Sequence, residues 1–280
     1  MTLSPLTPEF RTSAVAGSLP ADAPSAARTA YDALGADYDA LTADHDYERW
    51  LSVLEALALR HGLAGRRLLD LACGTGRSFE PMLRRGYDVT GCDVSPEMVR
   101  IARRRAPGVP IEVADMRALP DWGPFDLVTC LDDAVNYLPD ETGLDAAFAG
   151  VARVLRPGGL FVFDLNSLLT YRTAFTSTFT VDAGDVQFTV RGRAAPDVPP
   201  GAACPSRIEI RTRGPHGGWR RRRVSEHAQR HWPPDTVCSH LRTAGLDPVA
   251  VHGQTTGCVL HDTVDETARD TKVMLVARRD

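Results

Sequence analysis

The spacing of apolar residues changes along the chain and divides it into regions of different predicted structure. Between residues 31 and 63, apolar side chains recur near every third or fourth position, which is typical of helices. From 68 to 165, short continuous apolar runs alternate with helical spacing. Between 166 and 232, apolar and polar residues alternate with a period of two, and helical spacing returns at 233–244. This order predicts an α/β region interrupted by an antiparallel β segment.

The continuous apolar runs predict buried strands, because strands covered on both faces of a sheet are apolar throughout. One of the helices between them has Ser95 as its expected N-cap and Pro96 in its first turn. The expected strands are 68–72, 87–92, 111–114, 125–131, 160–165, 248–252 and 273–277, and the expected helices between them are 78–85, 96–105 and 141–155. The predicted fold class is therefore α/β, with a seven-stranded, mostly parallel sheet, helices on both faces, and an antiparallel β insertion after the fifth strand.

The same patterns predict how the chain is organised. Residues 1–30 are rich in Ala, Ser, Pro and Thr and are expected to form a mobile leader. Residues 31–165 are expected to form most of the core, with a helical cap at their N-terminal end. The insertion, 166–232, is expected to form a lid, and 233–280 to complete the core.

Composition narrows the range of functions. The chain has 280 residues, of which 43% are apolar and 24% charged, and its net charge of −4 argues against a general nucleic-acid binder. No apolar run reaches the length of about 18 residues that a membrane span needs. The six cysteines are scattered without a CxxC pair, which favours a reducing cytoplasm over a disulfide framework or a zinc site. We therefore expect a cytoplasmic protein with no metal, membrane or nucleic-acid partner, and the sequence does not indicate its oligomeric state.

A glycine-rich turn, within Leu69–Gly76, follows the first expected strand. Open α/β sheets bind ligands at the carboxyl ends of their strands, and glycines let the backbone approach a ligand closely. A dinucleotide fingerprint in this register requires glycine where the chain has Ala72 and Arg77. A P-loop requires a lysine in the turn, but the only lysine is Lys272, in the last expected strand. Neither phosphate-binding interpretation fits.

The turn resembles the first motif of the class I S-adenosylmethionine (SAM)-dependent methyltransferases, Asp/Glu-x-Gly-x-Gly-x-Gly. The stretch from Asp70 to Gly76 departs from that motif at Ala72, which replaces the first glycine. Four later segments resemble further motifs of the family and lie at the expected intervals: Gly91–Asp93, Val113–Arg117, Phe125–Val128 and Leu155–Gly159. The resemblance covers residues 67–165 and implies a Rossmann-like fold, with SAM as methyl donor and S-adenosylhomocysteine as product.

The resemblance also implies which residues hold the donor. In the family, an acid at the position of Asp93 accepts hydrogen bonds from both ribose hydroxyls, and an acid at the position of Asp115 lies beside the adenine amino group. The full set of expected cofactor-binding residues is Tyr38, Trp50, Asp70, Ala72, Cys73, Gly74, Gly76, Asp93, Val94, Met98, Asp115, Met116 and Leu131.

Aromatic residues near the N-terminus resemble the Tyr-Asp…Tyr-Asp…Trp start of small-molecule N-methyltransferases, including sugar-amine and glycine N-methyltransferases. Here the pattern is Tyr31-Asp32, Tyr38-Asp39 and Trp50. Aromatic faces suit a sulfonium cation, so Tyr38 and Trp50 are expected to cap the donor and Tyr31 to contact the methyl acceptor. The alternative is that these rings anchor a helix on the sheet.

The segment Cys130–Leu138 resembles the stretch that lies beside the transferable methyl group in the same N-methyltransferases. Asp133 is expected to take part in catalysis by orienting the acceptor, and Asn136 and Tyr137 are expected to bind it. The alternative is that Asn136 caps the following turn and Tyr137 belongs to the core.

The last strand of the insertion carries polar side chains at every second position. By alternation, Ser225, His227, Gln229 and His231 share one face, which is too polar for a core and is expected to face a cavity. His227 is the expected general base, because imidazole titrates near neutral pH, and Arg230 and His231 are expected to bind substrate. A metal site is disfavoured, because residues four apart on a strand lie ~13 Å apart. Two alternatives stay open: a solvated strand surface, and an amine that loses its proton to water without a dedicated base.

The sequence therefore predicts a SAM-dependent methyltransferase of biosynthetic (secondary) metabolism that acts on a small molecule, with an amine nitrogen as the favoured acceptor. O-methylation and a non-methylating use of SAM are alternatives within the fold. An RNA-modifying methyltransferase and a catalytically silent SAM-binding scaffold are alternatives of another class. For the first, the sequence offers only the basic run Arg220–Arg223, and the second would be expected to have lost Asp93 or the glycines.

Overall fold

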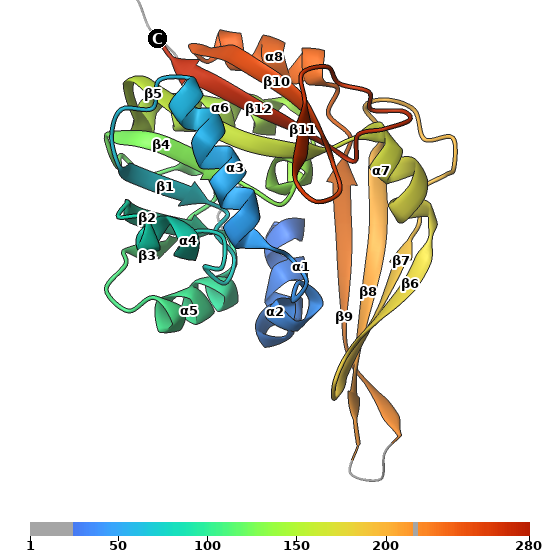
Figure 1. Ribbon diagram of the computed structural model, residues 1–280. Coiled ribbons are helices and arrows are strands. Elements are labelled where there is room, and N and C mark those ends of the chain that lie inside the picture. The colour runs from blue at the N-terminus through green and yellow to red at the C-terminus, as the bar shows by residue number, and fades with distance from the viewer. Residues whose placement is uncertain (1–24, 215–217) are drawn as a thin grey trace, which may run out of the picture.

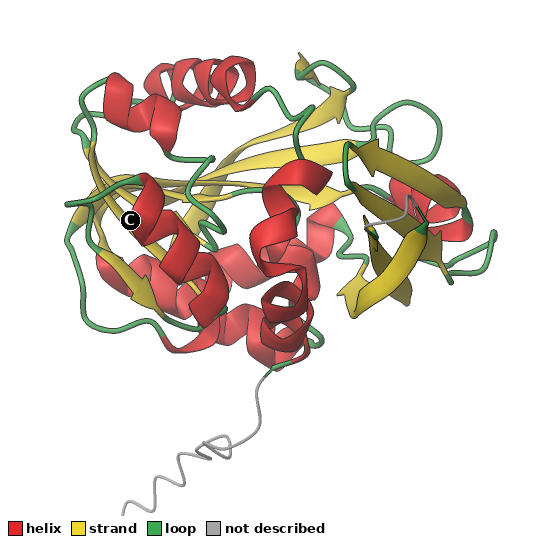
Figure 2. Ribbon diagram, turned by 90° about the horizontal axis from the view of Figure 1, so that it is seen from below, coloured by secondary structure: helices red, strands yellow, loops and turns green. Residues whose placement is uncertain are grey.

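The computed structural model of the protein describes residues 25–214 and 218–280. An eight-stranded sheet with helices on both faces stands beside a four-stranded antiparallel sheet (Figures 1 and 2). In the described residues no helix is long and apolar enough to cross a membrane. The predicted α/β class with an antiparallel insertion is therefore confirmed.

The large sheet has the strand order β11-β10-β12-β5-β4-β1-β2-β3. Its strands are β1 (Arg67–Leu71), β2 (Asp88–Asp93), β3 (Ile111–Val113), β4 (Phe125–Cys130), β5 (Leu155–Asn166), β10 (Leu246–Thr255), β11 (Val259–His261) and β12 (Lys272–Arg279). Strands β1 to β5 pair in parallel, whereas β12 is antiparallel to both β5 and β10. The seven expected strands are all present. The eighth, β11, has three residues, too few to show a periodicity in the sequence.

The helices follow the predicted order with two differences: the N-terminal helical segment is divided, and a short helix at Leu168–Thr173 begins the insertion, for which only strands were expected. They are α1 (Ala26–Leu34), α2 (Tyr38–Leu41), α3 (Tyr47–Arg60), α4 (Glu80–Arg84), α5 (Pro96–Arg105), α6 (Glu141–Val154), α7 (Leu168–Thr173) and α8 (Pro234–Thr243). In α5, the Ser95 hydroxyl accepts a hydrogen bond from Met98 N at 3.2 Å, and Pro96 is the first helical residue, as predicted.

The predicted leader is wrong at its C-terminal end, because residues 26–30 form the first part of α1. The Ser25 hydroxyl caps this helix by accepting from Arg28 N at 3.1 Å, and Ala30 is buried. Residues 1–24, to which the rest of that prediction applies, lie outside the described residues. The helical segment 31–63 is divided into α1, α2 and α3 rather than continuous.

The insertion forms the second sheet, with the order β6-β7-β8-β9. Its strands are β6 (Thr178–Ala183), β7 (Val186–Gly192), β8 (Ala203–Arg213) and β9 (Trp219–Arg230). Helix α1 packs against β9, so a helix from the start of the chain lies between the two sheets (Figure 1). This contact brings the N-terminal segment and the insertion to the same side of the large sheet. The division of the chain into domains stays a prediction.

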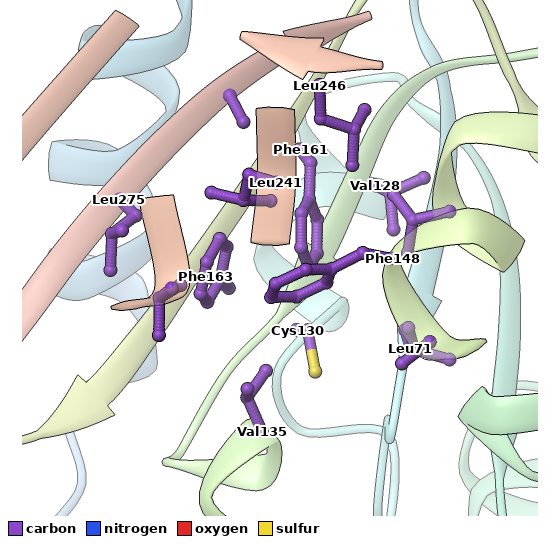
Figure 3. Close-up of a cluster of buried hydrophobic side chains, with 14 of the residues drawn as sticks. Leu71, Val128, Cys130, Val135, Phe148, Phe161, Phe163, Leu241, Leu246 and Leu275 are labelled. Atoms are coloured by element: carbon purple, nitrogen blue, oxygen red, sulfur yellow. The ribbon is translucent and has the colours of Figure 1, made fainter. Parts of the chain in front are cut away.

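Aliphatic side chains and a group of phenylalanine rings fill the core on the face of the large sheet that α6 and α8 cover (Figure 3). Phe161 and Phe163 of β5 stack with ring centroids 4.4 Å apart, and Phe148 of α6 meets Phe161 edge to face at 6.0 Å. All three rings are fully buried. This packing fixes β5 and β4 beneath α6, and it thereby fixes the strand ends at which the functional residues lie.

We predict that Phe161→Ala lowers the free energy of unfolding by about 3–5 kcal/mol, because it removes a buried ring and leaves a cavity. Urea unfolding monitored by circular dichroism measures the change. Leu59→Ala is the control: Leu59 is 55% exposed on α3, so its loss should change stability by no more than about 0.5 kcal/mol. Equal effects of the two substitutions would contradict the described core.

Candidate active site

The turn after β1 brings its backbone against the end of β2. The amide of Cys73 donates to Cys92 O at 2.9 Å, and Gly76 N donates to Cys73 O at 2.9 Å. Gly76 has φ +87°, and a Cβ there would lie 2.8 Å from the Phe79 ring, so the position requires glycine. Ala72 also has positive φ, at 60°. A glycine would adopt this conformation without strain, whereas alanine does so at a cost on the order of 1 kcal/mol.

Asp70 lies beneath the turn and holds it, rather than lining the cleft above it. Its carboxylate accepts hydrogen bonds from Ser78 Oγ at 2.5 Å and Thr129 Oγ1 at 2.7 Å, and the side chain is buried. Burial raises the Asp70 pKa to about 6, against the lowering effect of the two hydroxyls. Asp70 therefore joins β1, β4 and the segment before α4.

Asp93, at the end of β2, connects that strand to the glycine turn. Its two carboxylate oxygens accept hydrogen bonds from Gly74 N and Ser95 N, both at 2.9 Å. Burial raises the Asp93 pKa to about 6, although both backbone donors favour the carboxylate. Asp93 also lines a cleft, so part of its hydrogen-bonding capacity faces a ligand space.

Two adjoining clefts run along the carboxyl ends of β1, β2 and β4, and we call them together the groove. They share the lining residues Ala27, Ala72, Val94, Met116, Ala134 and Tyr137. The first, of about 350 Å³, also includes Asp115, Leu138 and Ala228. The second also includes Tyr31, Tyr38, Tyr47, Cys73, Gly74, Asp93, Leu131 and Asp132. Most of the expected cofactor-binding residues therefore meet in one place.

Asp115 lines the groove but already has a strong partner. Arg117 Nη2 donates to it at 2.6 Å and Arg117 N at 2.9 Å. Burial tends to raise the Asp115 pKa, but the Arg117 hydrogen bonds outweigh it and lower the pKa below its usual value. The carboxylate is therefore charged at neutral pH, and it shares its oxygens between the arginine and any ligand.

Four tyrosine rings line the second cleft: Tyr31, Tyr38, Tyr47 and Tyr137. The ring centroid of Tyr31 lies 5.9 Å from that of Tyr38 and 5.4 Å from that of Tyr137. The Tyr47 hydroxyl donates to Asp132 Oδ2 at 2.5 Å. Aromatic faces beside a carboxylate form a setting that favours a cation.

Asp132 and Asp133 follow β4 in the left-handed conformation, with φ 56° and 52°, which is strained backbone for residues other than glycine. Asp133 does not line the groove, because Lys272 Nζ donates to it at 3.0 Å and Gln229 Nε2 at 2.5 Å. Lys272 also donates to Asp164 Oδ2 at 2.6 Å. Burial opposes the Lys272 charge, but attraction to Asp164 and Asp133 outweighs it and raises the lysine pKa. Asp133 is thus part of an ionic network behind the groove in which Asp164 is fully buried and Asp133 and Lys272 are partly buried.

His227 is buried on β9 and reaches the groove through a second residue. Its Nδ1 lies 2.8 Å from the Tyr137 hydroxyl, and its Nε2 lies 2.7 Å from Ser225 Oγ. Burial lowers the His227 pKa to about 4, so the imidazole is neutral at physiological pH. The groove itself is lined by Tyr137 and not by His227. A direct role for His227 as a base near its ordinary pKa is therefore disfavoured.

Several expected site residues lie away from the groove. Met98 is buried in a core cluster beneath α1. Asn136 donates to Arg230 O at 2.8 Å and accepts from Asn166 N, so it joins β9 to the large sheet. His231 pairs with Glu266 at 3.0 Å and accepts from Gly201 N, and it is buried.

Trp50 and Arg230 are also placed differently from expectation. The indole of Trp50 donates to Gln254 Oε1 at 3.2 Å and lines a third cleft, of about 470 Å³, with Lys272 and with Asp132, which also lines the groove. The guanidinium of Arg230 donates to Pro139 O and lies over the Trp232 ring at 4.8 Å. In the described part of the chain, no group of three or more His, Cys, Asp or Glu side chains could hold a metal ion.

The sequence prediction assigned no role to Tyr47, Asp132 or Lys272. Asp132 lies between Leu131 and Asp133, which are both expected site residues, so its position in the sequence could have identified it. The role of Tyr47 depends on how α3 follows α2, and that of Lys272 on the pairing of β12 with β5. Neither relation leaves a trace in local spacing.

Comparison with known proteins identifies similar proteins among the methyltransferases. Residues 68–159 match a family described as a methyltransferase domain. A putative methyltransferase, YqeM, of Bacillus subtilis is 34% identical over 54% of this chain and 62% of its own length. The chain thus spans less than two thirds of that relative. A dTDP-3-amino-3,6-dideoxy-alpha-D-glucopyranose N,N-dimethyltransferase of Streptomyces fradiae is 30% identical over 66% of this chain and 70% of its own length.

Two further comparisons bear on the acceptor and on the fold. A ubiquinone biosynthesis O-methyltransferase of Xanthomonas oryzae is 39% identical over 40% of this chain and 48% of its own length. A solved structure of an S-adenosylmethionine-dependent methyltransferase from Clostridium acetobutylicum has a TM-score of 0.73 at 24% identity. It covers 87% of this chain and 96% of that one. The solved structure shows likeness of fold, and the relatives include both N- and O-methyltransferases.

We predict a pH dependence of stability that is specific to Asp93. Its pKa is about 6 in the folded protein and near 3.8 when exposed, so the native state binds more protons between these values. Stability from this group is therefore lost as the pH rises from about 4 to about 6. Relative to Asp93→Asn, the wild type should lose on the order of 2 kcal/mol over that window.

Urea unfolding at a series of pH values measures this difference. Asp88→Asn, at the exposed start of the same strand, is the control and should keep the wild-type slope. If Asp93→Asn also kept the wild-type slope, the raised pKa of Asp93 would be wrong.

Proposed function

Because this chain is a member of the S-adenosylmethionine-dependent methyltransferases, we propose that it transfers a methyl group from SAM to an amine nitrogen of a small molecule. The observation that supports the choice of nitrogen is the second cleft, which is lined by four tyrosine rings and by Asp132. An amino sugar is the class of amine that the Streptomyces fradiae relative suggests.

The residues of the groove fit SAM by their chemistry. The carboxylate of Asp93 faces the groove and has the two acceptor oxygens that a ribose diol needs. Backbone at Gly74 approaches the groove without a side chain, and a Cβ there would face the Tyr38 ring at 3.9 Å. Ala114, Met116 and Leu138 give the first cleft apolar walls for a flat base. Asp115 would then accept from the adenine amino group while Arg117 holds it in place.

The other expected cofactor-binding residues divide by position. Tyr38, Ala72, Cys73, Val94 and Leu131 line the groove and would contact the donor directly. Asp70 and Gly76 would act on the donor by shaping the turn.

When bound, SAM supplies a methyl group on a sulfonium, which a nucleophile displaces in line. The tyrosine faces stabilise positive charge in the groove, both on the donor and on the nitrogen that becomes an ammonium. Asp132 contributes a negative charge at the same place, with its orientation fixed by Tyr47. These groups favour a neutral amine nucleophile and disfavour an oxyanion.

The alternatives are O-methylation or another use of SAM within the fold, and an RNA-modifying methyltransferase or a silent scaffold from another class. RNA binding is disfavoured because Arg223, in the basic run, forms an ion pair with Asp37 within the protein. A silent scaffold is disfavoured because the chain has Asp93 and two of the motif's glycines, Gly74 and Gly76. We further propose that the enzyme acts in the cytoplasm, in biosynthetic (secondary) metabolism, with no nucleic-acid or membrane partner.

We predict saturable binding of SAM by isothermal titration calorimetry. Asp93→Asn should weaken it by about 10- to 100-fold, because a charge-assisted hydrogen bond contributes about 1.5–3 kcal/mol. Asp88→Asn on the same strand should bind like the wild type. Absence of saturable binding by the intact wild type would sink the proposed function.

We predict that nitrogen, not oxygen, is methylated. The protein is incubated with labelled SAM and either dTDP-3-amino-3,6-dideoxyglucose or its 3-hydroxy counterpart, with a catechol as the phenol probe. Mass spectrometry should locate the label on nitrogen of the amino sugar only. Label on the hydroxyl or the phenol, with none on the amine, would replace N-methylation by O-methylation.

A further inference from the structure

The third cleft shares one lining residue with the groove, Asp132. Among its other lining residues, Trp50 and Gln254 are buried, and His45 and Thr256 are exposed. The cleft therefore extends from the surface of the protein to a residue of the second cleft. Of the groove residues, Asp132 is the one that a molecule in the third cleft would meet.

The two carboxylate oxygens of Asp132 face lining residues of different clefts. Oδ2 accepts from the hydroxyl of Tyr47, at 2.5 Å, and Tyr47 lines the second cleft. Oδ1 lies 3.8 Å from Nδ1 of His45, which lines the third cleft, and this separation is too long for a hydrogen bond. Among the described residues no donor bonds to Oδ1. Asp132 Oδ1 is therefore an acceptor with capacity for a ligand N–H.

The side chain of Gln254 supplies a hydrogen-bond donor in the same cleft. Gln254 is 7% exposed, and its Oε1 accepts from Trp50 Nε1 at 3.2 Å, which fixes the orientation of the amide. Its Nε2 donates to no group in the part of the chain that the structure describes. A nearly buried amide N–H without an acceptor is unfavourable, so this arrangement suits a ligand that supplies one.

The polar face of β9, which the sequence predicted to receive the methyl acceptor, has its hydrogen bonds taken up within the protein. Both ring nitrogens of His227 lie within hydrogen-bond distance of a hydroxyl. The amide of Gln229 is bonded to three other side chains, those of Asn166, Tyr171 and Asp133. A polar ligand therefore has less to gain at this face than in the third cleft.

We propose that the third cleft binds the methyl acceptor, an amine that also carries hydroxyl groups, with its N–H bonded to Asp132 Oδ1 and a hydroxyl oxygen bonded to Gln254 Nε2. This rests on the proposed function and adds to it a binding site for the acceptor. Because Asp132 borders both clefts, a nitrogen bound there lies at the boundary with the donor groove, where an in-line displacement requires it.

The charges around the third cleft agree with an amine at Asp132. Lys272 lines the cleft, but its charge is balanced by the two carboxylates to which it donates, Asp133 and Asp164. The exposed lining residues have charges of both signs, from Asp44, Asp46 and Arg49, so they set no single charge for the outer part of the acceptor.

The methyl transfer itself balances without a further reactant. The nitrogen lone pair forms the N–C bond, the S–C bond breaks, and its electron pair stays on sulfur. The nitrogen becomes an ammonium beside the Asp132 carboxylate, which stabilises the positive charge. Its proton then passes to water at the exposed end of the third cleft.

Nitrogen-15 NMR of protein with labelled tryptophan tests where the acceptor binds and needs no turnover. The protein is saturated with S-adenosylhomocysteine and titrated with dTDP-3-amino-3,6-dideoxyglucose, and the Trp50 indole signal is assigned by comparison with Trp50→Phe. The Trp50 signal should shift and reach saturation, because its N–H bonds to Gln254 in the cleft. The signal of Trp232, which is buried in the core and lines none of the three clefts, should stay unchanged. Saturable binding of the sugar with Trp50 unmoved would overturn the proposal.

Steady-state kinetics with a variant that fills the cleft give a second test. Thr256→Trp should raise KM for the amino sugar by about tenfold or more, because the indole would occupy space that the acceptor needs, and it should leave the Kd for SAM unchanged. Thr263→Trp is the matched control, because Thr263 is also an exposed threonine near β11 but lies outside the lining of the three clefts. Equal KM values for the two variants would contradict an acceptor in the third cleft.

Asp132→Asn tests the contact with nitrogen. It should raise KM for the amino sugar by about 10- to 100-fold, as expected for the loss of a charge-assisted hydrogen bond, whereas Asp88→Asn should keep the wild-type KM. A wild-type KM in Asp132→Asn would overturn the role of Asp132. If the wild type methylates the amine but the third-cleft variants behave like their controls, this proposal alone fails. If the wild type neither binds nor methylates the amine, the proposed function fails with it.

Discussion

The carboxylate of Asp93 is the constraint on which the geometry of the groove depends. It is buried at the end of β2 and accepts backbone hydrogen bonds both from the turn after β1 and from the start of α5. Removing it would leave the half-buried amide of Gly74 and the buried amide of Ser95 without this partner, and it would release the turn from its neighbour strand. Burial raises the Asp93 pKa because it disfavours the charged form of the carboxylate. Keeping this carboxylate charged therefore lowers the stability of the folded protein. A ligand that donates hydrogen bonds to this carboxylate gains from a site whose orientation is already fixed.

The sequence was sufficient for the large sheet and for most of the groove, because both depend on local features. Continuous apolar runs mark the parallel strands, and the motif residues lie at the ends of those strands. The remaining residues are placed by contacts between segments far apart in the sequence, which local patterns do not predict. Asn136 looked like a ligand contact but joins β9 to the sheet, and Trp50 pairs with Gln254, more than two hundred positions away in the chain. Short β11 and the start of α1 had too few residues for a periodic signal.

The alternation of polar residues along β9 correctly predicted that their side chains share one face of the strand. It did not predict the surroundings of that face. That face meets α1 and the large sheet, and its side chains are buried and hydrogen-bonded to one another and to backbone. A buried polar network of this kind is costly unless every donor finds an acceptor, and this requirement fixes the direction of its bonds. The same requirement explains why Lys272 lies at the start of β12, where Asp133 and Asp164 meet.

The lengths of the outer strands differ between the two sheets, and this bears on self-association. The eight-stranded sheet ends in β3 and β11, each of three residues, which offer few unpaired backbone groups to another chain. The insertion ends on one side in β9, against which α1 packs, and on the other in β6, a six-residue strand that carries the exposed ring of Phe179. Edge-to-edge addition of a strand from a second molecule is therefore opposed at the sheet that bears the groove and least opposed at β6.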